Sequence, residues 1–149
     1  MSSPAAETIA ADARGESPLW AQALRRPPDW EPVFSALAPG QYTLGLETVY
    51  EAYLVHYGES RLFHSPGADE RVLLGDYLYA HGLVKIAQAG GVDAVAVMAD
   101  LISTCASLRA AGAPGDGEAW VEATRLLGGD AGGDEVARAL ERHYVRVAA

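Results

Sequence analysis

The sequence predicts an all-α protein, a single helical bundle of five to seven helices. Apolar residues recur every three or four positions through most of the chain, which is the spacing of one face of a helix. Glycine- and proline-rich stretches divide these segments into helical lengths, and no segment alternates apolar and polar residues as a half-buried strand does. With 149 residues, the chain is long enough for one domain with a substantial core and short for two.

The N-terminal part is predicted to hold a tail and two short helices. Residues 1–16 are small, polar and rich in alanine, and we interpret them as a mobile tail that precedes a helical domain at 17–149. Ser17-Pro18 is typical of a helix start, with serine as the N-cap and proline in the first turn. Asp29 could cap a second short helix over 30–37, which Pro39-Gly40 would end.

Five longer helices are predicted to follow. Apolar spacing indicates a helix that ends at Gly58, then a long helix from about residue 68 to 89 that Gly90-Gly91 breaks. Residues 92–112 carry one apolar stripe and predict the next helix. The last two helices are expected at 118–127 and 134–147, with a glycine-rich loop between them.

Composition excludes several classes of function. The formal net charge of -9 argues against binding to nucleic acid and to anionic membrane surfaces, which both favour basic proteins. The single cysteine, Cys105, excludes an internal disulfide. The N-terminus lacks the features of a signal peptide, and no uninterrupted apolar run approaches the roughly 18 residues of a membrane span. We therefore expect a cytoplasmic protein with no transmembrane segment.

Histidine and glycine patterns give no local motif for a metal or a phosphate. The four histidines, at positions 56, 64, 81 and 143, show none of the short spacings of zinc ligands. The glycine-rich segments near the C-terminus follow no predicted strand and lack the lysine of a phosphate-binding loop. We interpret them as turns.

The most informative stretch is "RVLLGDYLYAHGLVKIAQAGG", in which Gly75 and Asp76 interrupt an apolar helix. Together with the following "VDAVAVMADLISTC", it resembles the trans-polyprenyl diphosphate synthase family, over roughly residues 40–110. It is also similar to the non-catalytic component of heptaprenyl diphosphate synthases. The resemblance implies part of the isoprenoid-synthase fold, with Gly75 at a tight helix crossing. It also implies that Asp76 is a buried carboxylate and, with Tyr77, lies near the substrate.

The resemblance also implies a position for the family's Mg2+ ligands. The family's aspartate-rich motif falls on "ETVYE", so that Glu47 and Glu51 would be the metal ligands, four residues apart on one helical face. The family's diphosphate-binding Arg-Arg-Gly falls on residues 56–58, which read His-Tyr-Gly, and leaves Arg61 as the nearby substitute. The second aspartate-rich motif has no counterpart in this chain, which has about half the usual length.

These departures lead to a functional prediction with no catalytic residue assigned. The chain is expected to be a non-catalytic or accessory synthase-like protein that acts by subunit association, with itself or with a catalytic prenyl-synthase subunit. Two alternatives remain open. One is a small module that binds an isoprenoid diphosphate or lipid, and the other is a half-site prenyltransferase subunit that a partner chain completes. If Asp76 is a buried structural carboxylate, Asp76→Ala should destabilise the fold more than Glu51→Gln.

Overall fold

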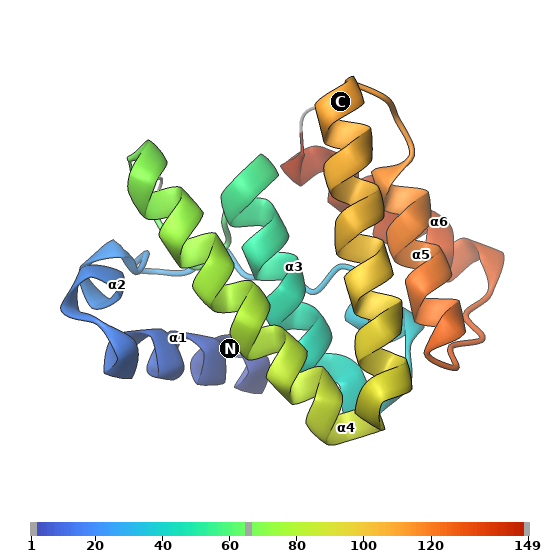
Figure 1. Cartoon of the computed structure of the whole chain (residues 1–149), viewed down its shortest axis with the longest axis horizontal. Coiled ribbons are helices and arrows are strands. Elements are labelled where there is room, and N and C mark those ends of the chain that lie inside the picture. Colours follow the sequence, from blue (N-terminus) through green and yellow to red (C-terminus); the bar gives the residue numbers. More distant parts are fainter. Residues whose placement is uncertain (1–2, 65–66, 148–149) are drawn as a thin grey trace.

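The computed structural model describes residues 3–64 and 67–147 and confirms the all-α prediction (Figure 1). These residues form six α-helices and two short 3-10 helices, and the described part of the chain contains no strand, only an isolated bridge between Leu24 and Phe63. The elements in order are α1 (Pro4–Glu16), α2 (Pro18–Ala23), η1 (Ser35–Leu37), η2 (Gly40–Tyr42), α3 (Thr43–Tyr57), α4 (Ala68–Ala111), α5 (Asp116–Leu126) and α6 (Gly133–Arg146).

The bundle is built around α3. Figure 1 shows α3 lying between the two arms of a V formed by α4, with α1 and α2 on one side and α5 and α6 on the other. Of the 15 residues of α3, 11 are buried, including charged ones. A helix surrounded in this way has no polar face, which explains why its apolar residues are distributed around the axis rather than along one stripe.

The long helix α4 runs through Gly90-Gly91 and bends there, where a break between two helices was predicted. The bend is at Gly91, whose φ of 73° and ψ of -160° lie outside the helical region. A residue with a side chain is strained at such a φ, so glycine is required at this position. The prediction of a helix on each side of the glycines is therefore correct, but the two helices are directly continuous.

Glycines allow α3 and α4 to cross closely, as expected for Gly75. A Cβ atom on Gly75 would lie only 2.3 Å from Nε2 of His56, and one on Gly82 would lie 2.5 Å from the Val49 side chain. On α3, Gly45 meets Ile86 of α4 in the same way, at 2.7 Å. Each of these distances is below normal van der Waals contact, so larger residues would separate the two helices.

The N-terminal segment differs from the predicted mobile tail. Residues 4–16 form α1, with Ala6, Ile9 and Ala13 buried against the rest of the bundle. The alanine-rich composition that indicated a tail also favours a helix, and this stripe of small apolar residues gives the helix a surface to dock. Residues 1 and 2 lie outside the described part of the structure.

The second correction concerns residues 30–37, which were predicted to form a helix capped by Asp29. Only Ser35–Leu37 is helical, as the 3-10 turn η1, and the preceding residues are irregular. Pro32 explains the difference, because proline disfavours helical geometry in the residue before it and removes a backbone donor.

The hydrophobic core has two parts. The larger cluster joins α3 to α5, α6 and the second arm of α4, and the smaller one joins α3 to α1, α2 and the first arm of α4. Tyr79 packs against both clusters. In the larger cluster the Phe34 and Trp120 rings stack, with centroids 5.5 Å apart, and this stack attaches the segment before η1 to α5.

Candidate functional site

Both residues predicted as metal ligands, Glu47 and Glu51, are hydrogen-bonded to Arg61 in the interior. Arg61, in the loop after α3, donates from Nε to Oε1 of Glu51 at 2.9 Å and from Nη1 to Oε1 of Glu47 at 2.7 Å. The three side chains are almost completely buried, with exposures of 0%, 0% and 2% for Arg61, Glu51 and Glu47. The guanidinium also lies over the Trp30 ring, 3.9 Å from its centroid. We call this group the Arg61 network.

The remaining carboxylate oxygens of the Arg61 network also have donors. Ser35 donates its hydroxyl hydrogen to Oε2 of Glu47 at 2.6 Å. Oε2 of Glu51 accepts from the Ser60 hydroxyl and from the backbone N–H groups of Arg61 and Leu62, the latter two at 3.1 and 3.2 Å. Burial alone would lower the pKa of Arg61, but the charges of Glu51 and Glu47 outweigh burial and raise it. Each carboxylate oxygen of the network thus has at least one hydrogen-bond donor.

These residues do not fit a Mg2+ site. Mg2+ needs oxygen ligands with free lone pairs arranged around it, usually together with several waters. Here all four carboxylate oxygens face donors, and one of those donors is a buried cation. The described residues also contain no group of three histidine, cysteine, aspartate or glutamate side chains placed to hold a metal ion.

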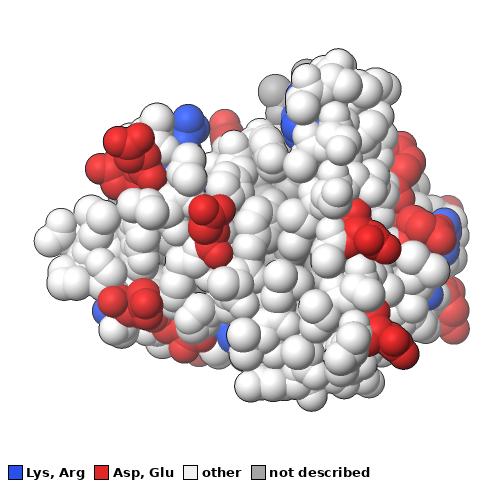
Figure 2. All heavy atoms as spheres, in the orientation of Figure 1, with Lys and Arg blue, Asp and Glu red and all other residues white. Residues whose placement is uncertain are grey.

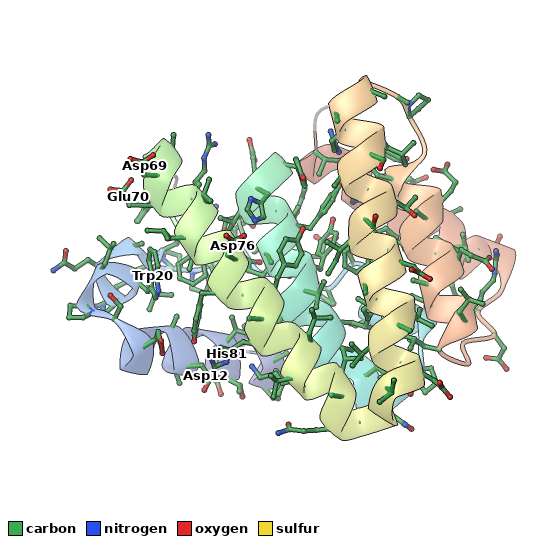
Figure 3. All side chains as sticks on the ribbon, in the orientation of Figure 1. Asp12, Trp20, Asp69, Glu70, Asp76 and His81 are labelled. Atoms are coloured by element: carbon green, nitrogen blue, oxygen red, sulfur yellow. The ribbon has the colours of Figure 1, made fainter. Side chains whose placement is uncertain are left out.

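Asp76 is exposed, which corrects the expectation of a buried carboxylate. Its side chain has 68% exposure, and its Oδ1 lies 3.5 Å from Nε2 of His56. The reason is the glycine next to it: Gly75 points at α3, so Asp76 is turned toward solvent, on the first arm of α4 (Figure 3). The stability order expected from the sequence is therefore reversed, and Glu51→Gln should cost more than Asp76→Ala.

Tyr77 is half-buried beside His81, with ring centroids 4.4 Å apart. Burial raises the pKa of Tyr77 to about 12, and the negative charges of Asp12 and Glu16 add to the effect. Its hydroxyl has no hydrogen-bond partner among the described residues. Neither Asp76 nor Tyr77 is hydrogen-bonded to the Arg61 network, so the structure does not bring the five predicted site residues together.

A second polar network, which the sequence did not reveal, is centred on Asp116 at the start of α5. Oδ2 of Asp116 accepts from the Tyr53 hydroxyl at 2.7 Å, from Nη2 of Arg109 at 2.7 Å, and from Nε2 of His143 at 2.9 Å. Nδ1 of His143 lies 2.8 Å from the Tyr50 hydroxyl. We call these five residues the Asp116 network. They come from α3, α4, α5 and α6 and lie far apart in the sequence, so the sequence alone did not indicate that they are in contact.

The surroundings of the Asp116 network shift the pKa values of Asp116 and Tyr50 in opposite directions. Burial alone would raise the pKa of Asp116, but the hydrogen bonds from His143, Tyr53 and Arg109 outweigh burial and hold it below its usual range. Burial also raises the pKa of Tyr50 above its usual value, so Tyr50 is a neutral donor. His143 lies between these two groups, with Nε2 2.9 Å from Oδ2 of Asp116 and Nδ1 2.8 Å from the Tyr50 hydroxyl.

An aspartate, a histidine and a hydroxyl in series have the order of a nucleophilic relay, but the position of these residues argues against one. His143 has 0% exposure and Tyr50 has 1%, so a substrate could not reach either group. The network instead joins four helices through satisfied buried polar groups, which fixes their relative positions. The one sequence feature that pointed to this network was the spacing of Tyr50 and Tyr53, which lie about one helical turn apart on the same face of α3.

The outer surface of α4 carries four of the nine large hydrophobic side chains that are exposed among the described residues. We define the α4 face as Val72, Leu73, Asp76, Ala80, Val84, Ala87, Val92, Ala96, Ala99, Ser103, Ser107 and Ala110, all of which are exposed and follow helical spacing along the two arms. Figure 2 shows this side of the molecule largely uncharged, with separated acidic groups. By length and composition alone, α4 could also cross a membrane, a test that core helices of other proteins pass too.

The described residues thus form a small all-α protein whose hydrophobic core encloses two polar networks and whose α4 face is exposed and mainly apolar. Comparisons with protein-family models, with curated proteins and with solved structures found no match to this chain. The resemblance to polyprenyl diphosphate synthases therefore rests on the sequence motif around Gly75 and Asp76.

Proposed function

We propose that this chain is a non-catalytic, accessory subunit of the polyprenyl-diphosphate-synthase type, which acts by binding a partner subunit through the α4 face. The observation that carries the proposal is the exposure of the largest apolar side chains on this face. Val92 is 83% exposed, Leu73 59%, and Val84 56%. Exposed apolar residues lined up on a helix face mark an interaction site, and complete burial of a Val or Leu side chain contributes at most about 1.5–3 kcal/mol.

The charges beside the α4 face favour a different chain over a second copy as the partner. Asp76 lies within the face, and Asp93 and Asp100 are exposed next to it on the second arm. Two copies packed by this face would bring these acids together, and none of the residues that define the face is basic. A partner with an apolar helical surface and basic residues around it would be complementary. The sequence resemblance makes a catalytic prenyl-synthase subunit in the cytoplasm the candidate.

The Arg61 network supports the non-catalytic part of the proposal. The positions where the family would hold Mg2+ carry Glu47 and Glu51, and Arg61 occupies the space between their carboxylates. Reopening the site would require breaking two buried ion pairs, each of which is costly to separate. The proposed activity therefore lies in the partner, and the association should not depend on Mg2+.

The test is to mix the purified chain with a full-length trans-polyprenyl diphosphate synthase from the same organism and measure binding by calorimetry and light scattering after gel filtration. We expect a stoichiometric complex, with equal affinity in the presence of Mg2+ or EDTA. Val92→Glu should weaken the complex by about tenfold or more, because it places a charge in the apolar interface. Val145→Glu on α6 is the matched control, since Val145 is also 83% exposed but lies outside the α4 face.

Three outcomes would contradict the proposal. The first is a chain that remains monomeric and binds no synthase. The second is equal weakening by Val92→Glu and Val145→Glu, which would place the interface elsewhere. The third is a dimer of the chain alone that Val92→Glu dissociates, which would confirm the α4 face as an interface but replace the partner by a second copy.

A further inference from the structure

A groove at the opposite end of the molecule from α5 and α6 has no role in the proposed association. It lies between α1 and the segment that follows α2, and has a volume of about 550 Å³. Its apolar surface is formed by Ala6 and Ala10 of α1, by Leu24 and Leu62, and by the half-buried Trp30. This size is within the range of sites for small organic molecules, and an apolar lining with a few charged groups is their usual composition.

The charged residues of the groove are mostly basic, unlike the rest of the protein. Arg14, Arg25 and Arg26 line it together with one acid, Glu7, which gives the lining a charge of about +2 in a chain with a net charge of -9. Arg25 donates from Nη1 to the Ser60 carbonyl at 2.7 Å. Arg14 and Arg26 are exposed, and within the described residues neither makes a hydrogen bond or an ion pair through its guanidinium.

We propose that this groove binds a small anionic amphiphile, a molecule with an apolar body and a carboxylate or phosphate head. The apolar body would cover the Ala6, Ala10 and Leu62 surface, and the head would be held by Arg14 and Arg26. Guanidinium groups suit both heads, because their paired N–H donors match two oxygens of a carboxylate or phosphate. Charge complementarity favours a negatively charged ligand. Three of the chain's 11 basic residues line the groove, although the net charge of the whole protein is negative.

The groove favours a single small molecule over a peptide. A bound peptide is usually held by a helix face or a strand edge along several residues, and the described structure has no sheet edge. This inference is independent of the proposed function, since none of the groove residues belongs to the α4 face. Loss of partner binding and loss of amphiphile binding can therefore be separated by variants.

Calorimetry on the full chain, with probes kept below their micelle concentrations, tests the proposal. Decyl phosphate and decanoate should bind, and the tighter of the two identifies the preferred head. Decyltrimethylammonium, decanol and inorganic phosphate should each bind about tenfold more weakly or worse, because each lacks the anionic head or the apolar body. The indole N–H resonance of Trp30 should shift with the two binding probes, since Trp30 lines the groove.

Two sets of variants locate the site. The double variant Arg14→Gln/Arg26→Gln should lose about tenfold or more in affinity for decyl phosphate. The double variant Arg125→Gln/Arg138→Gln removes the same charge from exposed positions on α5 and α6 and should bind normally. Ala10→Phe should block the apolar body, with the helix content unchanged by circular dichroism.

Several results would overturn the inference. Equal affinity for decyl phosphate and decyltrimethylammonium would show non-specific adsorption of the alkyl chain. Equal losses in the two double variants would show that only the overall charge matters. No binding of decyl phosphate or decanoate to the wild-type protein would exclude the proposed ligand class.

Discussion

The helices α3 and α4 are both mainly apolar in composition, but α3 is surrounded by other helices and α4 is largely exposed. Both are predominantly apolar and both contain isolated carboxylates. Yet 11 of the 15 residues of α3 are buried, against 9 of the 44 residues of α4. The carboxylates follow the same division: Glu51 on α3 is 0% exposed and paired with Arg61, whereas Asp76 on α4 has 68% exposure.

This difference shows that an acid in an apolar helix has two possible explanations, which only the neighbouring elements can distinguish. In α3 the acid is retained in the interior because an arginine and several hydroxyl and amide groups compensate its burial. In α4 it is on the outside, and the unusual feature is the apolar surface around it. The first situation stabilises a fold, and the second indicates a surface for association.

The largest expected effect comes from removing the cation of the Arg61 network. Arg61→Leu leaves two buried carboxylates unpaired and should lower the free energy of unfolding by about 3–5 kcal/mol. Arg142→Leu is the matched control: Arg142 pairs with Glu31 at 2.9 Å, but both side chains are more than 40% exposed, so the cost should be below about 1 kcal/mol. Urea denaturation monitored by circular dichroism measures both.

A triple variant makes the same experiment sharper. Combining Arg61→Leu with Glu47→Leu and Glu51→Leu removes all three charged side chains of the Arg61 network together, and should recover much of the stability that Arg61→Leu alone loses. A cost for Arg61→Leu no larger than that for Arg142→Leu would contradict a buried, paired network.

The next largest loss of stability is expected at Leu74, on the buried side of α4, and the adjacent Leu73 on the exposed side is its control. Leu74 is 0% exposed and Leu73 is 59% exposed. Leu74→Ala should destabilise the isolated chain by about 2–5 kcal/mol, because it leaves a cavity against α3. Leu73→Ala should change the stability by less than about 0.5 kcal/mol. Thermal and urea unfolding of the two variants measure the difference, and comparable losses would mean that the α4 face is packed against the rest of the chain.

The smallest expected effect is a change in the pKa of His56 on α3, which lies beside Asp76 on α4. Burial lowers the pKa of His56 below its ordinary value of 6.5, while the nearby charge of Asp76 partly offsets the shift. Asp76→Asn should therefore lower the pKa of His56 further. An NMR titration of the His56 ring protons measures it. A pKa that rises or stays constant would exclude the contact with Asp76.

The shift at His56 also sets the sign of a pH effect on stability. Because the pKa is lower in the folded state, the unfolded chain binds more protons between the two pKa values. This contribution to stability is fully present above pH 6.5 and is lost as the pH falls through the folded-state value. Because Asp76→Asn lowers the folded-state pKa of His56 further, the pH range over which this stability is lost should extend to lower pH.

Helical spacing was sufficient to predict the fold class and most of the longer helices. The C-terminal helices α5 and α6 were predicted at 118–127 and 134–147 and are observed at Asp116–Leu126 and Gly133–Arg146. The prediction for the N-terminal residues was wrong because their composition is compatible with two structures. Alanine-rich sequence is compatible with either a tail or a helix, and docking of Ile9 selects the helix α1.

Side-chain partners could not be predicted in the same way. Glu47 and Glu51 were correctly expected on one helical face, but spacing along the chain does not show that Arg61 in the next loop turns inward between them. The Asp116 network was more difficult still, because its five residues span positions 50 to 143. Only the packing of four helices brings these residues within hydrogen-bond distance.

The bend at Gly91 allows α5 and α6 to pack against α3 of the same chain. A straight helix of 44 residues would be about 66 Å long and would carry α5 and α6 far from α3. Straightening is the outcome that a bulkier residue at position 91 would favour, since the φ of 73° is strained for any residue with a side chain. The C-terminal helices of one copy would then find their packing surface on the α3 of another. Gly91 thus separates a self-contained bundle from a domain-swapped pair of chains.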